Sequence, residues 1–215
     1  MRAVKFRTLS CFFGVFFFFQ SEASGRTLGS AAGLVVTDNE QASKAGMEIL
    51  VRGGNAIDSA IATAFALSVV DQASSGLGGG GFMVIYRAKD KKAFALDFRE
   101  TAPQASRREL YMKDGKAVPS VSLIGALAVA VPGEVAGLVE AHKRFGTLPL
   151  AILTSPAIKL AAEGFPVDGA LGVAIERQQS NMKRFSDLGR IYMPNGEVPK
   201  QGDIIRQPQL AETLK

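Results

Sequence analysis

The sequence predicts an α+β protein in which helices cover an antiparallel sheet. Helical patterns come before and after the strand patterns, without the regular alternation that surrounds a parallel sheet. A glycine-rich loop leads into Phe82–Tyr86, and a turn later the chain returns as Ala93–Arg99, which indicates a hairpin. The chain has 215 residues, of which 47% are hydrophobic and 21% charged, and this is enough to build a sizeable core.

The first residues have the pattern of a secretory signal peptide. A basic start precedes the apolar run 9–19, which is too short to span a bilayer because that takes about 20 residues. Ser21 and Ala23 place small residues three and one positions before a cut after Ala23. A signal anchor that stays uncleaved is the alternative. We expect a signal peptide over 1–23 and an exported region over 24–215, periplasmic or extracellular and without a stable membrane span.

Charge and cysteine content exclude several functions. Basic residues exceed acidic ones by 25 to 20, but three of the cations lie in the leader and the others form no basic run, so we expect no nucleic-acid partner. The single cysteine, Cys11, also lies in the leader. The exported region therefore offers no disulfide, no cysteine-ligated metal and no cysteine nucleophile. We expect neither a cofactor nor a metal.

Two helices are predicted before the hairpin. Thr37 and Glu40 have capping-box spacing, which predicts a helix from there to Val51. Asn55 is expected to cap a second helix over 56–70, whose residues are apolar or small nearly all round. Such a helix is typical of a buried layer.

The remaining elements follow from turn and helix-stop signals. Asp114-Gly115 predicts a turn, Ser122–Val131 a strand, and glycines end two expected helices. These two helices are expected over 134–145 and 156–163. A looping segment over 189–207 follows, and a last helix is expected over 208–215.

The glycine-rich loop matches a nucleotide-binding pattern in letters only. Gly76, Gly78 and Gly81 fit GxGxxG, but here the glycines follow a helix and open a strand, the reverse of the dinucleotide-binding order. From the residues alone, a tight backbone crossing in the core is the preferred interpretation.

Arg99 is the candidate binding residue. A guanidinium at the end of a strand suits a substrate carboxylate, which it can bind through two parallel hydrogen bonds. Spacing alone favours a structural salt bridge with Asp97 or Glu100. The single histidine, His142, lies between charged neighbours in an expected helix and is predicted to be on the surface. The sequence therefore offers no Ser-His-Asp triad, and no metal-ligand cluster is visible.

Several blocks, in order, resemble the γ-glutamyltranspeptidase family. They are GGNAIDSAIATAFALSVVDQASSGLGGGGFMVIY, LDFRETAP, VPGEVAGL, PAIKLAAEGFPV and GDIIRQPQLAETL, and the resemblance runs over 32–215. It implies the four-layer αββα sandwich of the N-terminal-nucleophile hydrolases, of which this chain would be the large-subunit portion. It also implies that Arg99 binds the α-carboxylate of the γ-glutamyl group, and that the glycine run lies beside the active site.

The resemblance further implies a precursor that cuts itself into a large and a small subunit. The threonine exposed at the start of the small subunit is then the nucleophile, and its own α-amino group is the base. Nothing up to Lys215 matches this threonine, so we expect it beyond that residue. Thr101, Thr154 and Thr213 fall in large-subunit blocks and are given no catalytic role.

The expected function is that of an exported γ-glutamyltransferase and glutathione hydrolase. It would cleave the γ-glutamyl amide of glutathione-like substrates and pass the acyl group to water, amino acids or peptides, with its own small subunit as partner. The alternatives are a glutaryl-type acylase acting on β-lactam precursors and a truncated, non-catalytic binding chain. Alone, the chain is expected to be inactive and to expose a strand edge and apolar faces such as that of 56–70.

Overall fold

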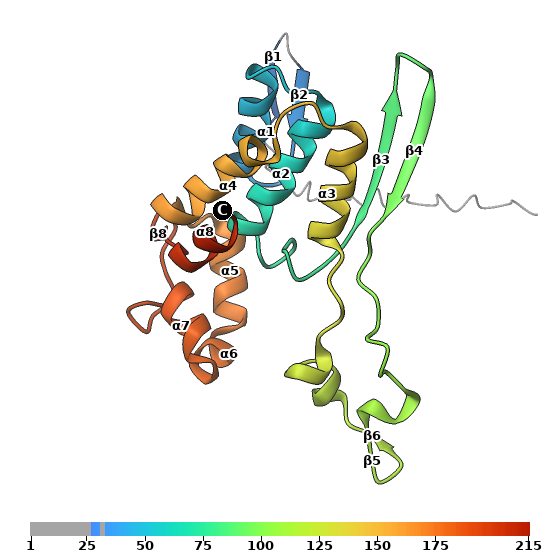
Figure 1. Ribbon diagram of the computed structural model, residues 1–215. Helices are drawn as coiled ribbons and strands as arrows, with labels where there is room; N and C mark the ends of the chain where they lie inside the picture. The colour runs from blue at the N-terminus through green and yellow to red at the C-terminus, as the bar shows by residue number, and fades with distance from the viewer. Residues whose placement is uncertain (1–26, 31–32) are drawn as a thin grey trace, which may run out of the picture.

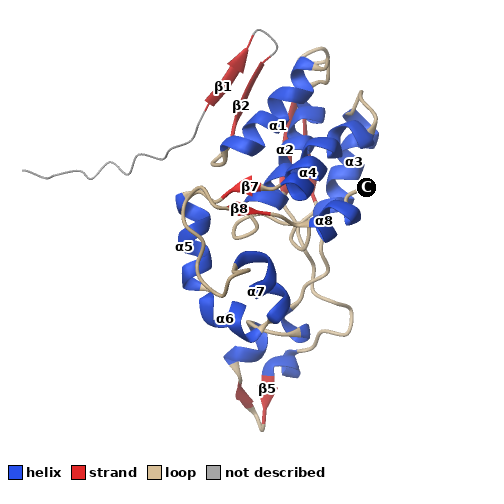
Figure 2. Cartoon of the chain, turned by 90° about the vertical axis from the view of Figure 1, so that its left-hand side faces the viewer, coloured by secondary structure: helices blue, strands red, loops and turns tan. Residues whose placement is uncertain are grey.

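The computed structural model describes residues 27–30 and 33–215 (Figures 1 and 2). The predicted signal peptide lies outside these residues. The described chain mixes helices with short antiparallel strand pairs, so the α+β class is confirmed. The pairs are β1 (Thr27–Ser30) with β2 (Gly33–Val36), β3 (Phe82–Arg87) with β4 (Lys92–Asp97), β5 (Met112–Lys113) with β6 (Lys116–Ala117), and β7 (Phe165–Pro166) with β8 (Ile204–Ile205).

Helices form most of the core. The α-helices are α1 (Glu40–Val51), α2 (Ala56–Val70), α3 (Glu134–Phe145), α4 (Leu150–Glu163), α5 (Gly169–Arg177), α6 (Gln179–Arg184), α7 (Ser186–Tyr192) and α8 (Pro208–Thr213). Three 3₁₀ turns are η1 (Arg108–Tyr111), η2 (Pro119–Ser122) and η3 (Ala126–Ala128). Among the described residues, no helix has the length and apolar character needed to cross a membrane.

Helix α2 lies at the centre of the core, between α1, α3 and α4 (Figure 1). Ile61, Phe65 and Val69 are among its buried residues. The expectation that the face of 56–70 would be exposed in this chain is therefore wrong, because neighbouring helices of the same chain cover it. The hairpin β3–β4 instead projects past α3 with little covering it (Figure 1).

The start of α1 differs from the predicted capping box. Asn39 is the cap: its Oδ1 accepts hydrogen bonds from the N–H groups of Gln41 (2.9 Å) and Ala42 (3.3 Å). Thr37 lies two residues earlier, where its hydroxyl contacts the backbone of Asn39 and the hydroxyl of Ser43. An asparagine next to the first helical residue reaches the free N–H groups directly, so Asn39 caps the helix in place of the predicted Thr37.

The start of α2 confirms the predicted cap. Asn55 Oδ1 accepts from the N–H groups of Ile57 (2.8 Å) and Asp58 (2.9 Å), and Asp58 Oδ2 accepts from the Asn55 N–H (3.0 Å). Asp58 is fully buried and also accepts from the N–H (3.0 Å) and hydroxyl of Thr147. This carboxylate therefore joins the start of α2 to the turn between α3 and α4.

Two further predictions need correction. The segment 122–131 is not a strand: it contains the last residue of η2 and the whole of η3, and among its residues only Val131 forms a β-bridge, with Thr101. A strand needs a hydrogen-bonding neighbour along its length, and here it has one at a single residue. Helix α4 begins at Leu150, six residues earlier than expected. It accommodates an internal proline because the Ser155 hydroxyl donates (2.8 Å) to the Ile152 carbonyl, which Pro156 cannot reach with a hydrogen bond.

Candidate functional site

The candidate site lies where β4 leaves the hairpin. The pairing of β3 with β4 continues one residue further, because the Phe98 N–H donates to the Gly81 carbonyl (3.0 Å) and the Gly81 N–H to the Phe98 carbonyl (3.4 Å). Successive residues of a strand point to opposite faces. Phe98 and Arg99 are therefore placed on opposite sides of the hairpin end.

Phe98 faces helix α3 in very close contact. A methyl group on Gly137 would lie 2.1 Å from Phe98 Cγ, and one on Gly133 would lie 1.9 Å from the Phe98 carbonyl oxygen. The glycine loop joins the same crossing, since the Gly133 N–H donates to the Gly79 carbonyl (2.8 Å). A methyl group on Gly80 would lie 2.4 Å from the Phe98 oxygen. Three backbone segments thus meet with no space for a side chain.

This crossing partly confirms the interpretation of the glycine run. Gly80 and Gly81 make the close approaches, whereas no atom comes within 4 Å of a methyl group placed on Gly76 or Gly78. The loop leads from the end of α2 into β3, so the dinucleotide-binding order of strand, glycines and helix is not present.

Arg99 lies on the outward side and its side chain is 64% exposed. Its backbone N–H donates to Asp97 Oδ1 (3.1 Å), and its Nε lies 3.6 Å from Glu100 Oε1. The salt bridge with Glu100 is thus present, but an exposed pair of this kind contributes at most about 1 kcal/mol to stability. The guanidinium remains accessible from solvent, and its role in substrate binding stays a prediction.

The outward face next to Arg99 is apolar. Phe82, Val84 and Tyr86 alternate along β3 and are 64%, 80% and 66% exposed. Phe82 pairs with Asp97, so this face of β3 is continuous with the face of β4 that carries Arg99. Contiguous exposed apolar patches are typical of surfaces that interact with another molecule or element.

Glu134 is a functional candidate that sequence reasoning missed. It is the first residue of α3, it is 9% exposed, and its backbone N–H donates to Gly79 (3.1 Å). Burial away from water raises the pKa of its carboxyl group. The signal in the sequence was Pro132-Gly133 directly before an acidic residue, a pattern typical of a helix start.

The histidine and the threonines have structural roles. His142 is half-buried, not on the surface as predicted, because its Nε2 lies 2.7 Å from the Leu148 carbonyl oxygen and secures the turn after α3. The Thr154 hydroxyl donates to Ala151 (3.4 Å) within α4, and Thr213 donates to its own helix in the same way. Over residues 27–30 and 33–215, no group of acidic, histidine and cysteine side chains could hold a metal ion.

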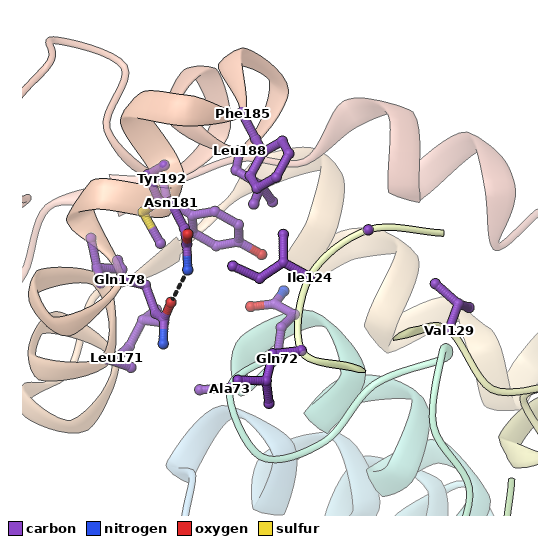
Figure 3. Close-up of a pocket in the computed structure, with 15 residues that line it drawn as sticks. Gln72, Ala73, Ile124, Val129, Leu171, Gln178, Asn181, Phe185, Leu188 and Tyr192 are labelled. Atoms are coloured by element: carbon purple, nitrogen blue, oxygen red, sulfur yellow. Dashed lines mark hydrogen bonds between the residues drawn. The ribbon is translucent and has the colours of Figure 1, made fainter. Parts of the chain in front are cut away.

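A separate apolar cavity of about 560 Å³ lies between the end of α2, the segment 123–129 and helices α5–α7 (Figure 3). Sequence analysis gave no indication of it, because its walls come from three distant parts of the chain.

Comparison with known proteins identifies relatives of most of the described region. The sequence profile of the family described as Gamma-glutamyltranspeptidase matches residues 42–215. Glutathione hydrolase 3 of Arabidopsis thaliana is 41% identical over 186 residues, which is 86% of this chain and 29% of that protein. The glutathione hydrolase proenzyme of Bacillus subtilis is 42% identical over 185 residues, 85% of this chain and 31% of that protein. The chain thus spans about a third of these curated relatives.

Solved structures of similar fold belong to related enzymes. The γ-glutamyltranspeptidase of Helicobacter pylori superposes with a TM-score of 0.82 at 36% identity, over 87% of this chain and 54% of that chain. A cephalosporin acylase from Bacillus halodurans superposes with a TM-score of 0.71 at 33% identity, over 80% and 33%. These neighbours are N-terminal-nucleophile hydrolases, which confirms the predicted fold class, with this chain supplying helices and a hairpin of the sandwich. Since the family profile covers most of the sequence, the chain belongs to the γ-glutamyltranspeptidase family.

Proposed function

We propose that this chain is part of the large subunit of a γ-glutamyltransferase and glutathione hydrolase. The enzyme would cleave the γ-glutamyl amide of glutathione-like donors and pass the acyl group to water, an amino acid or a peptide. The observation that carries the proposal is the position of Arg99, exposed at the end of an apolar sheet face and held by a backbone crossing without side-chain space. The relatives named glutathione hydrolase support it.

Arg99 would bind and orient the donor. Its planar guanidinium can hold the α-carboxylate through two parallel hydrogen bonds, which places the γ-carbonyl at a fixed distance from the anchor. The nucleophile would be a threonine freed by self-cleavage, in a part of the relatives that this chain does not cover. Its hydroxyl oxygen would attack the γ-carbonyl carbon, its α-amino group would take the proton, and the C–N bond would break as the leaving amine accepts that proton.

The small subunit would cover the outward face of β3–β4. Phe82, Val84 and Tyr86 offer it an apolar surface, and the hairpin offers free edges for further strands. We also propose export after cleavage of the signal peptide 1–23. A mass spectrum of the exported large subunit that begins at Ser24 would support this, and one that begins at Met1 would contradict it.

The test of the donor site is Arg99→Lys in the protein as its whole gene encodes it. Lysine keeps the charge but loses the planar fork. A hydrogen bond to a charged group contributes about 1.5–3 kcal/mol, so the Michaelis constant for a γ-glutamyl anilide should rise roughly ten- to a hundredfold. Arg99→Ala should raise it further, because the carboxylate would enter the site without a counter-charge.

Maturation and melting temperature are measured on the same proteins. Both should stay near wild type, since Arg99 is exposed, and Arg107→Lys, in the exposed loop that follows, is the matched control. An unchanged Michaelis constant in Arg99→Lys, or a loss of maturation with normal donor kinetics, would show that Arg99 has only a structural role.

A glutaryl acylase is the second candidate, favoured by the likeness to the cephalosporin acylase. A glutaryl donor lacks the α-amino group of a γ-glutamyl donor. Comparing kcat/KM for γ-glutamyl and glutaryl anilides separates the two activities, and preference for the glutaryl anilide would replace our proposal with the acylase.

A further inference from the structure

The apolar cavity lies apart from the Arg99 side chain, whose neighbours do not line it. One wall comes from α5–α7, with Leu171, Ile175 and Met182 buried on it. The opposite wall comes from the segment 123–129, and the floor from Gln72 and Ala73 just after α2 (Figure 3). A volume of about 560 Å³ is in the range of small-molecule sites.

Gln72 brings an unused hydrogen-bond acceptor to this cavity. Its Nε2 donates to the Val69 carbonyl, which fixes the orientation of the amide. Its Oε1 is buried and has no hydrogen-bond partner among the described residues. Figure 3 shows the amide reaching up beside Ile124, toward the side of the cavity that carries Tyr192. A buried acceptor without a donor costs about 1–3 kcal/mol unless something supplies one, so this group points to a ligand.

The lining contains no charged side chain. Tyr192 contributes a phenol whose pKa burial raises to about 12, so it stays neutral and can donate or accept. An ionised ligand would lose its hydration here without gaining a counter-charge. The cavity therefore disfavours the zwitterionic γ-glutamyl donors proposed for Arg99.

We propose that this cavity is a binding site for a small uncharged molecule with an apolar ring or branched body and one N–H or O–H group, which donates to Gln72 Oε1. A peptide segment fits less well. Each residue of a segment would bring a backbone donor and an acceptor into a cavity whose polar side chains are only Gln72, Gln178, Asn181 and Tyr192.

The test compares indole with indene on the protein as its whole gene encodes it. The two have the same fused-ring shape, but indene has no N–H group. Binding is measured by calorimetry and ligand-observed NMR. Indole should bind roughly two- to tenfold more tightly than indene, the difference expected for one net hydrogen bond.

Variants locate the interaction. Gln72→Met keeps the length of the side chain but removes the acceptor, so it should abolish the preference for indole while indene binds as before. Gln104→Met, on an exposed loop, is the matched control and should keep the preference. Ala174→Phe, on the α5 wall, should fill the cavity and weaken both ligands more than tenfold.

The proposal fails if neither compound binds, as it would if another part of the whole protein occupied the cavity. It also fails if indole and indene bind equally to the wild type, or if Gln72→Met keeps the preference. Should Ala174→Phe not fold, which its melting curve would reveal, the Gln72→Met comparison decides alone.

Discussion

Removal of the Asp58 carboxylate should cost more stability than any other acidic substitution in the core. Asp58 is fully buried, and its oxygens accept from the Asn55 N–H and from both the N–H and hydroxyl of Thr147. Asp58→Ala leaves these donors buried without an acceptor. Hydrogen bonds to a charged group contribute about 1.5–3 kcal/mol each and are not additive within one network, so we expect a loss of about 3–5 kcal/mol.

Asp58→Asn is the graded variant. It keeps one acceptor oxygen and replaces the other by an NH₂ group, so the loss should be about 1–3 kcal/mol. Asp187→Asn is the control. The Asp187 side chain forms an ion pair with Arg190 and is 85% exposed, so this substitution should change the free energy of unfolding by no more than about 0.5 kcal/mol. Urea denaturation followed by circular dichroism, on the whole protein, measures all three. A loss below about 1 kcal/mol in Asp58→Ala would refute the view that this carboxylate joins α2 to the α3–α4 turn.

Three further outcomes follow from the described contacts. Gly137→Ala should lower the stability by about 1–3 kcal/mol because its methyl group would overlap Phe98. Gly172→Ala should not, since the atom nearest to its methyl group would be 3.7 Å away. Equal melting temperatures of the two variants would contradict the crowded crossing. Burial raises the pKa of the Glu134 carboxyl group, so the stability tied to its bound proton is lost as the pH rises through the folded-state pKa. Glu134→Gln should therefore melt at a higher temperature than the wild type at neutral pH. This difference in melting temperature should shrink as the pH falls below 4.5, the ordinary pKa of the group. A pH-independent difference would count against burial as the cause. Val84→Lys should block assembly with the proposed small subunit, while Val51→Lys, at a similarly exposed position, should not, as size-exclusion chromatography of the matured protein would show.

Local signals in the sequence predicted the elements that local contacts determine. The helices at 40–51 and 56–70 and the hairpin were predicted correctly, because caps, glycines and apolar periodicity act within a few residues. The strand expected at 122–131 failed for the opposite reason, since a strand depends on a neighbour that sequence pattern does not reveal.

The candidate site divides in the same way. Arg99 was visible as a cation at a strand end, and the family resemblance gave it a role. The cavity around Gln72 was not visible, because residues about 50 to 120 positions apart form it and none of them is unusual in its own segment. Glu134 lies between these cases, since its helix start was predicted but its burial depends on the glycine loop.

The close contact of Phe98 with Gly133 and Gly137 has a consequence for how donor preference can change. Phe98 is packed closely against the glycines of α3, while the next residue, Arg99, is exposed in this chain and its ion pair contributes little to stability. If Arg99 binds the donor as proposed, a single substitution at 99 would change what the site can bind with little penalty in folding. Under the proposed role of Arg99, donor preference would then depend on one exposed side chain, and the packed ring of Phe98 would keep the backbone of every replacement at the same place.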